Sequence, residues 1–143
     1  MQPSHVLVPL DGSPLADEAL AHALAVFDCE VTVLNIITPL DSPLSEGGVL
    51  EVDDSRREDA HQRADRLLER ASQQAETEGQ TVETVVEVGD PAETILTYVE
   101  THDIDHIVMG SHSRDKHRLS RRLLGTVATA VLGEAPVPVT VIR

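Results

Sequence analysis

Aromatic side chains are nearly absent from this sequence of 143 residues, which contains one Phe, one Tyr and no Trp. Proteins that bind single-stranded nucleic acids stack the bases on aromatic rings, and this chain has almost no aromatic side chains for such stacking. Basic residues are also scarce, because 11 Lys and Arg stand against 25 Asp and Glu, a net charge of −14. Such a surface repels nucleic acids and anionic membranes, and any anion must be bound by a local feature. The acidic excess has two interpretations. The protein is adapted to a salt-rich cytoplasm, where ions screen the repulsion between its charges, or it is an ordinary acidic protein.

Cysteine and long apolar runs are lacking as well. Cys29 is the single cysteine, which excludes an intramolecular disulfide and a cysteine-based zinc site and favours an intracellular location. No run approaches the ~20 apolar residues that span a bilayer, and residues 1–10 lack the basic and apolar regions of a signal peptide. We therefore expect a soluble, cytoplasmic protein without a membrane or nucleic-acid partner.

The apolar residues that are present, 41% of the chain, are enough for one core, so we predict a single domain over residues 1–143. Apolar periodicity predicts strands at His5–Leu10, Glu30–Ile37, Thr81–Val88, Ile104–Met109 and Val137–Ile142. It predicts helices from Pro14 to Phe27, over Asp53–Glu78, from Pro91 onward and from about Leu123 to Glu134, with a loop at Thr38–Val52. Repeated alternation of strand and helix predicts an α/β fold, with a doubly wound parallel sheet and helices on both faces.

The end of the first strand carries a carboxylate. Asp11 follows the strand directly, and Ser13 and Pro14 are typical residues for the N-cap and first position of a helix. Ligands of open α/β sheets collect at such strand ends. Asp11 could therefore accept hydrogen bonds from a ribose hydroxyl or an adenine amino group. The alternative is that Asp11 only shapes the turn.

The end of the fourth strand predicts an anion site. Gly110 ends that strand, and Gly125 and Thr126 lie near the start of the next helix, where glycines, helix amides and a hydroxyl can receive a phosphate. His112, in the intervening loop, could also donate to an anion. Five of the 11 basic residues fall in nine positions of this loop: Arg114, Lys116, Arg118, Arg121 and Arg122. The alternative is a solvated basic loop or one that contacts an acidic partner.

Common catalytic patterns do not occur in the sequence. It has no glycine loop ending in Lys and Ser or Thr, no dinucleotide fingerprint after the first strand and no Gly-x-Ser-x-Gly motif. The seven His residues show no recognisable metal-ligand spacing. We expect no dedicated catalytic residue and no metal ligand, and any hydrolysis of a bound nucleotide should be slow.

These motifs together resemble those of the universal stress protein family over nearly the whole chain. The matching segments are Val8–Ser13, Val88–Pro91, Val108–His112, Leu123–Val127 and Pro136–Val139. The resemblance implies a Rossmann-like sheet of five strands in the order 3-2-1-4-5, whose order reverses between strands one and four. Asp11 and Gly110 would meet at that point.

The resemblance also implies a nucleotide site. Asp11 and Ile36 would border adenosine, and Gly125 with Thr126 would hold phosphate. The full set of implied contacts is Pro9, Leu10, Asp11, Ser13, Ile36, Met109, Gly110, His112, Ser113, Arg114, Gly125, Thr126 and Val127. The ligand would be ATP or another adenine nucleotide, with or without Mg²⁺. The ATP-binding branch of the family carries Gly-x2-Gly-x9-Gly before a Ser or Thr; here Ser113 stands at the middle Gly, and eleven residues separate it from Gly125.

Family resemblance further implies a homodimer that pairs the final strands, residues 137–142, of two subunits. Pro138 agrees with an edge position, because proline lacks a backbone donor and is tolerated mainly at sheet edges. The leading hypothesis is thus a stress-response protein that binds an adenine nucleotide as a regulatory ligand. A module of the same fold that binds protein partners without a nucleotide is the alternative, and an ATP hydrolase is a third.

Overall fold

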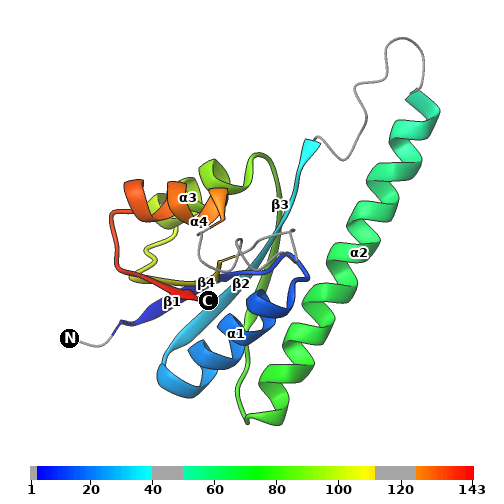
Figure 1. Ribbon diagram of the computed structural model, residues 1–143. Coiled ribbons are helices and arrows are strands. Elements are labelled where there is room, and N and C mark those ends of the chain that lie inside the picture. Colours follow the sequence, from blue (N-terminus) through cyan, green and yellow to red (C-terminus); the bar gives the residue numbers. More distant parts are fainter. Residues whose placement is uncertain (1–2, 40–49, 112–124) are drawn as a thin grey trace.

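The computed structural model describes residues 3–39, 50–111 and 125–143. Its strands are β1 (His5–Pro9), β2 (Glu30–Ile37), β3 (Glu83–Val88), β4 (His106–Gly110) and β5 (Val139–Ile142). Its helices are α1 (Pro14–Val26), α2 (Leu50–Thr77), α3 (Pro91–Thr101) and α4 (Thr126–Glu134). All neighbouring strands pair in parallel, in the order β3-β2-β1-β4-β5 (Figure 1). This confirms the predicted doubly wound sheet and its strand order.

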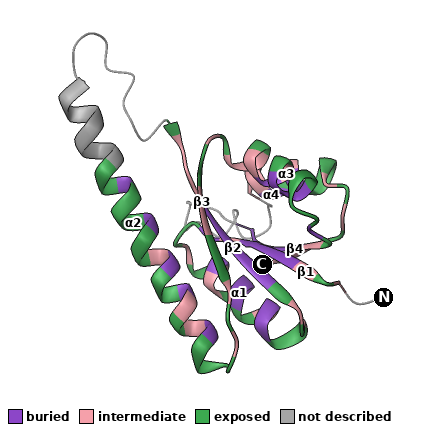
Figure 2. Cartoon of the chain, turned by 180° about the vertical axis from the view of Figure 1, so that it is seen from behind, coloured by how far each residue is buried: buried purple, intermediate pink, exposed green. Residues whose placement is uncertain are grey.

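The central strand β1 separates two halves of the core. Val6, Leu7 and Val8 are completely buried, and successive side chains point to opposite faces of the sheet. Val6 and Val8 pack with residues of α1 and α2, whereas Leu7 packs with residues of α3 and α4. Figure 2 shows the buried residues concentrated in the central strands and on the inner sides of the helices. Burial on both faces explains why β1 is apolar throughout after its first residue, His5.

The outer strands of the sheet are more exposed. All four residues of β5 are half-buried, and β3 contains no fully buried residue. Val88, at the end of β3, is 58% exposed. Among the residues that the structure describes, each of these strands pairs with a single strand, so each is an edge of the described sheet.

Several boundaries differ from the sequence prediction. α2 begins at Leu50, three residues earlier than expected, because Gly48 is the last helix breaker before it and Leu and Glu are strong helix formers. β3 and β4 begin two residues later than predicted, where their pairing with the neighbouring strand starts. β5 begins only at Val139, because Pro138 has no N–H to donate, although its carbonyl accepts from Ile107 N at 3.0 Å.

α4 begins at Thr126, and the predicted first residues of this helix, 123–124, lie outside the described residues. Within the described ranges, no helix has the length and apolar character needed to cross a membrane.

Candidate functional site

The strand order reverses between β1 and β4, which lie side by side at the centre of the sheet. Val6 pairs with His106 and Leu7 with Ile107. The helix α1, which follows β1, packs on one face of the sheet, and α4, the next helix after β4, packs on the other (Figure 1). Ligands of open α/β sheets bind at such reversal points, at the carboxyl ends of the strands. We call this region the carboxyl end of the sheet.

Asp11 lies in a tight turn at this end. Its Oδ1 accepts from Ser13 N at 2.9 Å, and Ser13 Oγ accepts from Ala16 N at 3.2 Å, which caps α1. Gly12 between them has a φ of +86°, a conformation that glycine adopts without strain. The turn-shaping role considered for Asp11 is therefore present. Asp11 is also exposed, and a carboxylate can accept more than one hydrogen bond, so this role does not exclude ligand binding.

Asn35 supports the same turn and was missed by the sequence analysis. Its side chain is 6% exposed, and its Nδ2 donates to the carbonyl of Leu10 at 2.7 Å. Leu10 N in turn donates to Leu34 O at 2.8 Å. Asn35 thus fixes the residue that precedes Asp11. The sequence did contain a signal for this role. Asn35 is a polar residue in the apolar run of β2, and a buried polar side chain requires a hydrogen-bond partner.

Gly110 has a structural reason for lacking a side chain. A Cβ there would lie 2.7 Å from the carbonyl carbon of Leu15 and 2.9 Å from Ala16 N, so the first turn of α1 fits against β4 only if this residue is glycine. Close packing of α1 therefore explains Gly110 without reference to a phosphate. It also places the start of α1 directly beside the end of β4.

The amino terminus of α4 differs from those of α1 and α3. Ser13 caps α1, and Asp90 caps α3 by accepting from Glu93 N at 3.0 Å. The N-cap of α4 is Gly125, which has no side chain to accept from the first helix amides. Thr126, the first residue of α4, is exposed. Amides at a helix start favour an anion, as the sequence analysis assumed for these two residues.

The apolar residues predicted to contact a nucleotide are packed into the core or against it. Leu10 and Met109 are each 4% exposed. Ile36 and Val127 are partly buried against the core between the sheet and α3 and α4. Pro9 is half-buried, and His112, Ser113 and Arg114 lie outside the described residues. The described apolar side chains at the carboxyl end therefore pack in or against the core, and they determine the form of this end mainly through that packing.

Two surface hollows occur elsewhere in the described part of the chain. The first runs along β3 and α3 and is lined by acids that include Glu87, Asp90 and Glu93, so it is unsuited to phosphate. The second lies beside the beginnings of β2 and β3, and its lining includes Glu30 and Glu83. Neither hollow includes the Asp11 turn.

Several side chains with displaced pKa values lie at the opposite, amino end of the sheet. Burial lowers the pKa of His106, and the charge of His22 lowers it further. Hydrogen bonds from the hydroxyl and amide of Ser4 lower the pKa of the Asp105 carboxyl. Burial, followed by the charge of Asp105, raises the pKa of the Cys29 thiol, which keeps it protonated and weakly nucleophilic.

Comparison with known proteins gives a consistent result. The model of the universal stress protein family matches residues 3–143. Universal stress protein MJ0531 of Methanocaldococcus jannaschii is 31% identical, over 96% of this chain and 81% of the relative. The solved structure of MJ0577 from the same organism has a TM-score of 0.83 at 28% identity, covering 99% of this chain and 96% of the other. UspA of Lactobacillus plantarum has a TM-score of 0.81 at 25% identity, covering 100% and 99%.

Two more distant structures contain nucleotides. One is a universal stress protein in complex with cAMP, which covers 100% of this chain and 99% of its own. The other, from Arabidopsis thaliana, has AMP bound and covers 98% of this chain and 91% of its own. Both have a TM-score of 0.71 and are 21% identical to this chain, which shows a shared fold.

Proposed function

The chain belongs to the universal stress protein family, and we propose that it binds an adenine nucleotide as a regulatory ligand at the carboxyl end, between β1 and β4. The observation that carries this proposal is the adjacency of the two strand ends, with the start of α1 packed against Gly110. Relatives of the same fold that hold AMP and cAMP support an adenine nucleotide as the ligand class.

The proposed roles divide the ligand between the two strand ends. Asp11 accepts hydrogen bonds from the nucleoside. Gly125 and Thr126 receive phosphate at the uncapped start of α4, where the helix dipole adds partial positive charge. The basic residues at 114–122 supply the positive field that a chain of net charge −14 otherwise lacks. This division assigns the nucleoside to a side chain and the phosphates to backbone amides and the basic segment.

The proposal includes no catalytic step. A nucleotide that is bound and released without rapid hydrolysis can report its cellular concentration to a partner protein, which is a regulatory role. We place this role in the cytoplasm, where a chain with a single cysteine needs no disulfide.

A binding experiment tests the proposal. Small molecules released from the purified, denatured protein should include an adenine nucleotide, and ATP, ADP or AMP should bind saturably in calorimetric titration. No released nucleotide and no saturable binding at millimolar concentration would contradict the proposal. That result would favour the alternative, a nucleotide-free interaction module.

Two variants distinguish the roles within the site. Asp11→Ala should weaken adenosine and ATP alike, by about tenfold, the value of one charge-assisted hydrogen bond. Arg114→Ala should weaken ATP more than adenosine, because a phosphate contact is missing from the nucleoside. Asp59→Ala, at an exposed site on α2, controls for the loss of one negative charge. Equal losses of ATP and adenosine in Arg114→Ala would show that Arg114 does not contact phosphate.

We further propose that two chains pair through their β5 edges. Pro138 O accepts from Ile107 N of β4 and Ile142 O accepts from Ser111 N just after it, so the N–H and C=O groups of Val139 and Val141 point to the open edge. An apolar edge with free backbone groups is suited to pairing with a second copy. Light scattering of the eluting protein should give the mass of a dimer, and a monomer at all concentrations would contradict this assembly.

A further inference from the structure

Three potential metal ligands from three strands meet at the amino end of the sheet. His5 begins β1, Glu30 begins β2 and Glu83 begins β3. The register pairs His5 with Glu30 and Thr32 with Glu83, so these side chains share one face of the sheet. Leu7, Leu34 and Val85, on the same face of the three strands, pack with α3 and α4, which therefore cover it. One nitrogen or oxygen ligand atom of each of His5, Glu30 and Glu83 lies within 4.8 Å of the others.

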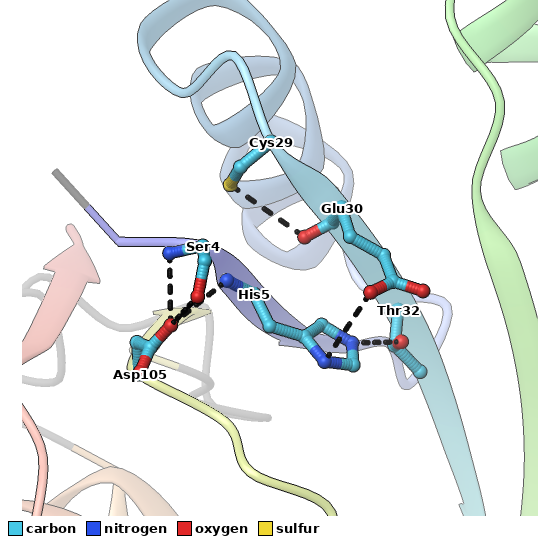
Figure 3. Close-up of polar contacts among 6 residues, drawn as sticks. All are labelled: Ser4, His5, Cys29, Glu30, Thr32 and Asp105. Carbon is cyan, nitrogen blue, oxygen red and sulfur yellow. Dashed lines mark hydrogen bonds and ion pairs between the residues drawn. The ribbon is translucent and has the colours of Figure 1, made fainter.

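The His5 ring is held in a fixed orientation. Its Nε2 lies 2.7 Å from Thr32 Oγ1, and Thr32 is completely buried (Figure 3). Its Nδ1 therefore faces Glu30, whose Oε2 is 3.7 Å away. The His5 side chain is 15% exposed and that of Glu30 is 62% exposed. A hydrogen bond that fixes the second ring nitrogen is the usual support of a metal-binding histidine.

The separation between His5 and Glu30 suits a bridging cation better than a direct hydrogen bond. At 3.7 Å, Nδ1 and Oε2 are too far apart for a hydrogen bond. Two ligands that are each about 2.1 Å from a tetrahedral zinc ion lie about 3.4 Å apart. Small rotations of the exposed Glu30 and Glu83 side chains would complete this geometry, since neither is held by burial.

The electrostatic surroundings also favour a cation. Glu30 and Glu83 bring two carboxylates together, and their repulsion would be relieved by a positive ion. α1 and α3 end at this side of the sheet without a basic residue in the last turn, so their negative dipole ends are not compensated. Besides burial, the charges of Glu83, Glu87 and Glu30 raise the pKa of the Tyr98 phenol, which shows that their negative potential extends beneath α3.

We propose that His5 Nδ1 and the carboxylates of Glu30 and Glu83 bind a divalent transition-metal ion of the zinc type. One imidazole and two carboxylates are ligands that Zn²⁺ accepts, with water in the fourth position on the exposed side. The ion links β1, β2 and the edge strand β3, so it stabilises the side of the sheet that is least buried. This site lies at the opposite end of the strands from the proposed nucleotide site and does not depend on that proposal.

Titration with Zn²⁺ alone, in the absence of nucleotide, tests the site. The wild type should bind one Zn²⁺ per chain in calorimetry, and its melting temperature should rise with Zn²⁺. His5→Asn and Glu83→Gln should each weaken binding at least tenfold and abolish the rise in melting temperature. In ¹⁵N spectra, Zn²⁺ should shift the Nδ1 resonance of His5.

His106→Asn is the matched control. His106 Nε2 makes the same type of contact with Thr140 Oγ1, at 2.8 Å, but no candidate metal group of the described residues includes His106. This variant should bind Zn²⁺ as the wild type does. Circular dichroism verifies that each variant is folded. If His5→Asn does not fold, Glu83→Gln still tests the site, because Glu83 is exposed. Absence of saturable Zn²⁺ binding, or equal binding in the wild type, His5→Asn and Glu83→Gln, would overturn the proposal.

Discussion

The two ends of the parallel sheet differ in the groups that they present. At the carboxyl end, where α1, α3 and α4 begin, backbone amides, glycines and the caps of the helices dominate. At the amino end, where the helices finish, charged side chains from β1, β2 and β3 come together. None of the described helices has a basic residue in its last turn.

The difference follows from strand direction. All five strands run the same way, and each connecting helix runs back against them, so the helix starts gather at one end and the helix terminations at the other. Helix dipoles make the first end locally positive and the second locally negative. The carboxyl end beside β1 and β4 is therefore suited to anions through its backbone, whereas the acids Glu87, Asp90 and Glu93 make its β3 side unsuited to them. The amino end is suited to cations through its side chains. The net charge of −14 strengthens the negative potential at the amino end. At the carboxyl end, local positive groups must outweigh this net charge before an anion can bind.

Changing Gly110 should damage the carboxyl end most severely. Gly110→Ala places a methyl group 2.7 Å from a backbone atom of Leu15, so α1 must move away from β4. Overpacking that displaces backbone costs about 3 kcal/mol of unfolding free energy. Urea denaturation measures this loss directly.

Gly133→Ala is the matched control for Gly110→Ala. Apart from the neighbouring residues and the backbone of α4 itself, no described atom lies within 4 Å of a Cβ at Gly133, and alanine is the better helix former. This variant should be as stable as the wild type or more stable, by about 0.5 kcal/mol. Equal stability of the two variants would show that α1 does not need close contact with β4.

The two ends also differ in how far the sequence predicts them. Asp11 and Ser13 form a contiguous turn whose residue types indicate a strand end and a helix cap, so this part of the carboxyl end could be predicted. His5, Glu30 and Glu83 are far apart in the sequence and meet only through the register of three strands. No spacing rule for metal ligands covers such a group, which explains why the sequence analysis found no metal-ligand pattern.

The sequence prediction was also incomplete at the carboxyl end. Glycine at position 110 suggested access for a phosphate, but its packing against Leu15 depends on the position of α1, which the sequence does not specify. The role of Asn35 depends on the carbonyl of Leu10, just after the neighbouring strand β1, so it too required the sheet pairing. Strand order and element type followed from periodicity and family resemblance, whereas these contacts between elements required the structure.

Ser13→Ala should have a smaller effect, confined to the carboxyl end. Ser13 Oγ accepts from Ala16 N at 3.2 Å, and loss of such a cap costs about 1 kcal/mol. The unfolding free energy should fall by this amount, while Zn²⁺ binding at the amino end should not change. A loss of Zn²⁺ affinity in this folded variant would show that the two ends of the sheet are coupled and not independent.

The smallest effect is expected at Asp105, and it should depend on pH. The Asp105 carboxylate accepts from Ser4 N at 2.8 Å and His5 N at 3.0 Å, which ties the start of β4 to the start of β1 (Figure 3). Hydrogen bonds from Ser4 foremost lower its pKa in the folded chain below the ordinary value of 3.8. A lowered pKa contributes stability above the unfolded value, and this contribution is lost as the pH falls through the folded value.

Asp105→Asn should therefore be less stable than the wild type at pH 7, and the difference should begin to shrink as the pH falls below about 3.8. Urea midpoints between pH 7 and pH 3 measure this convergence. Asp103→Asn is the control, because Asp103 is an exposed acid with a φ of 53°, which asparagine tolerates. A stability difference between Asp105→Asn and the wild type that stays constant over this range would mean that Asp105 acts through shape rather than charge. The negative character of the amino end would then reside in its glutamates and helix ends alone.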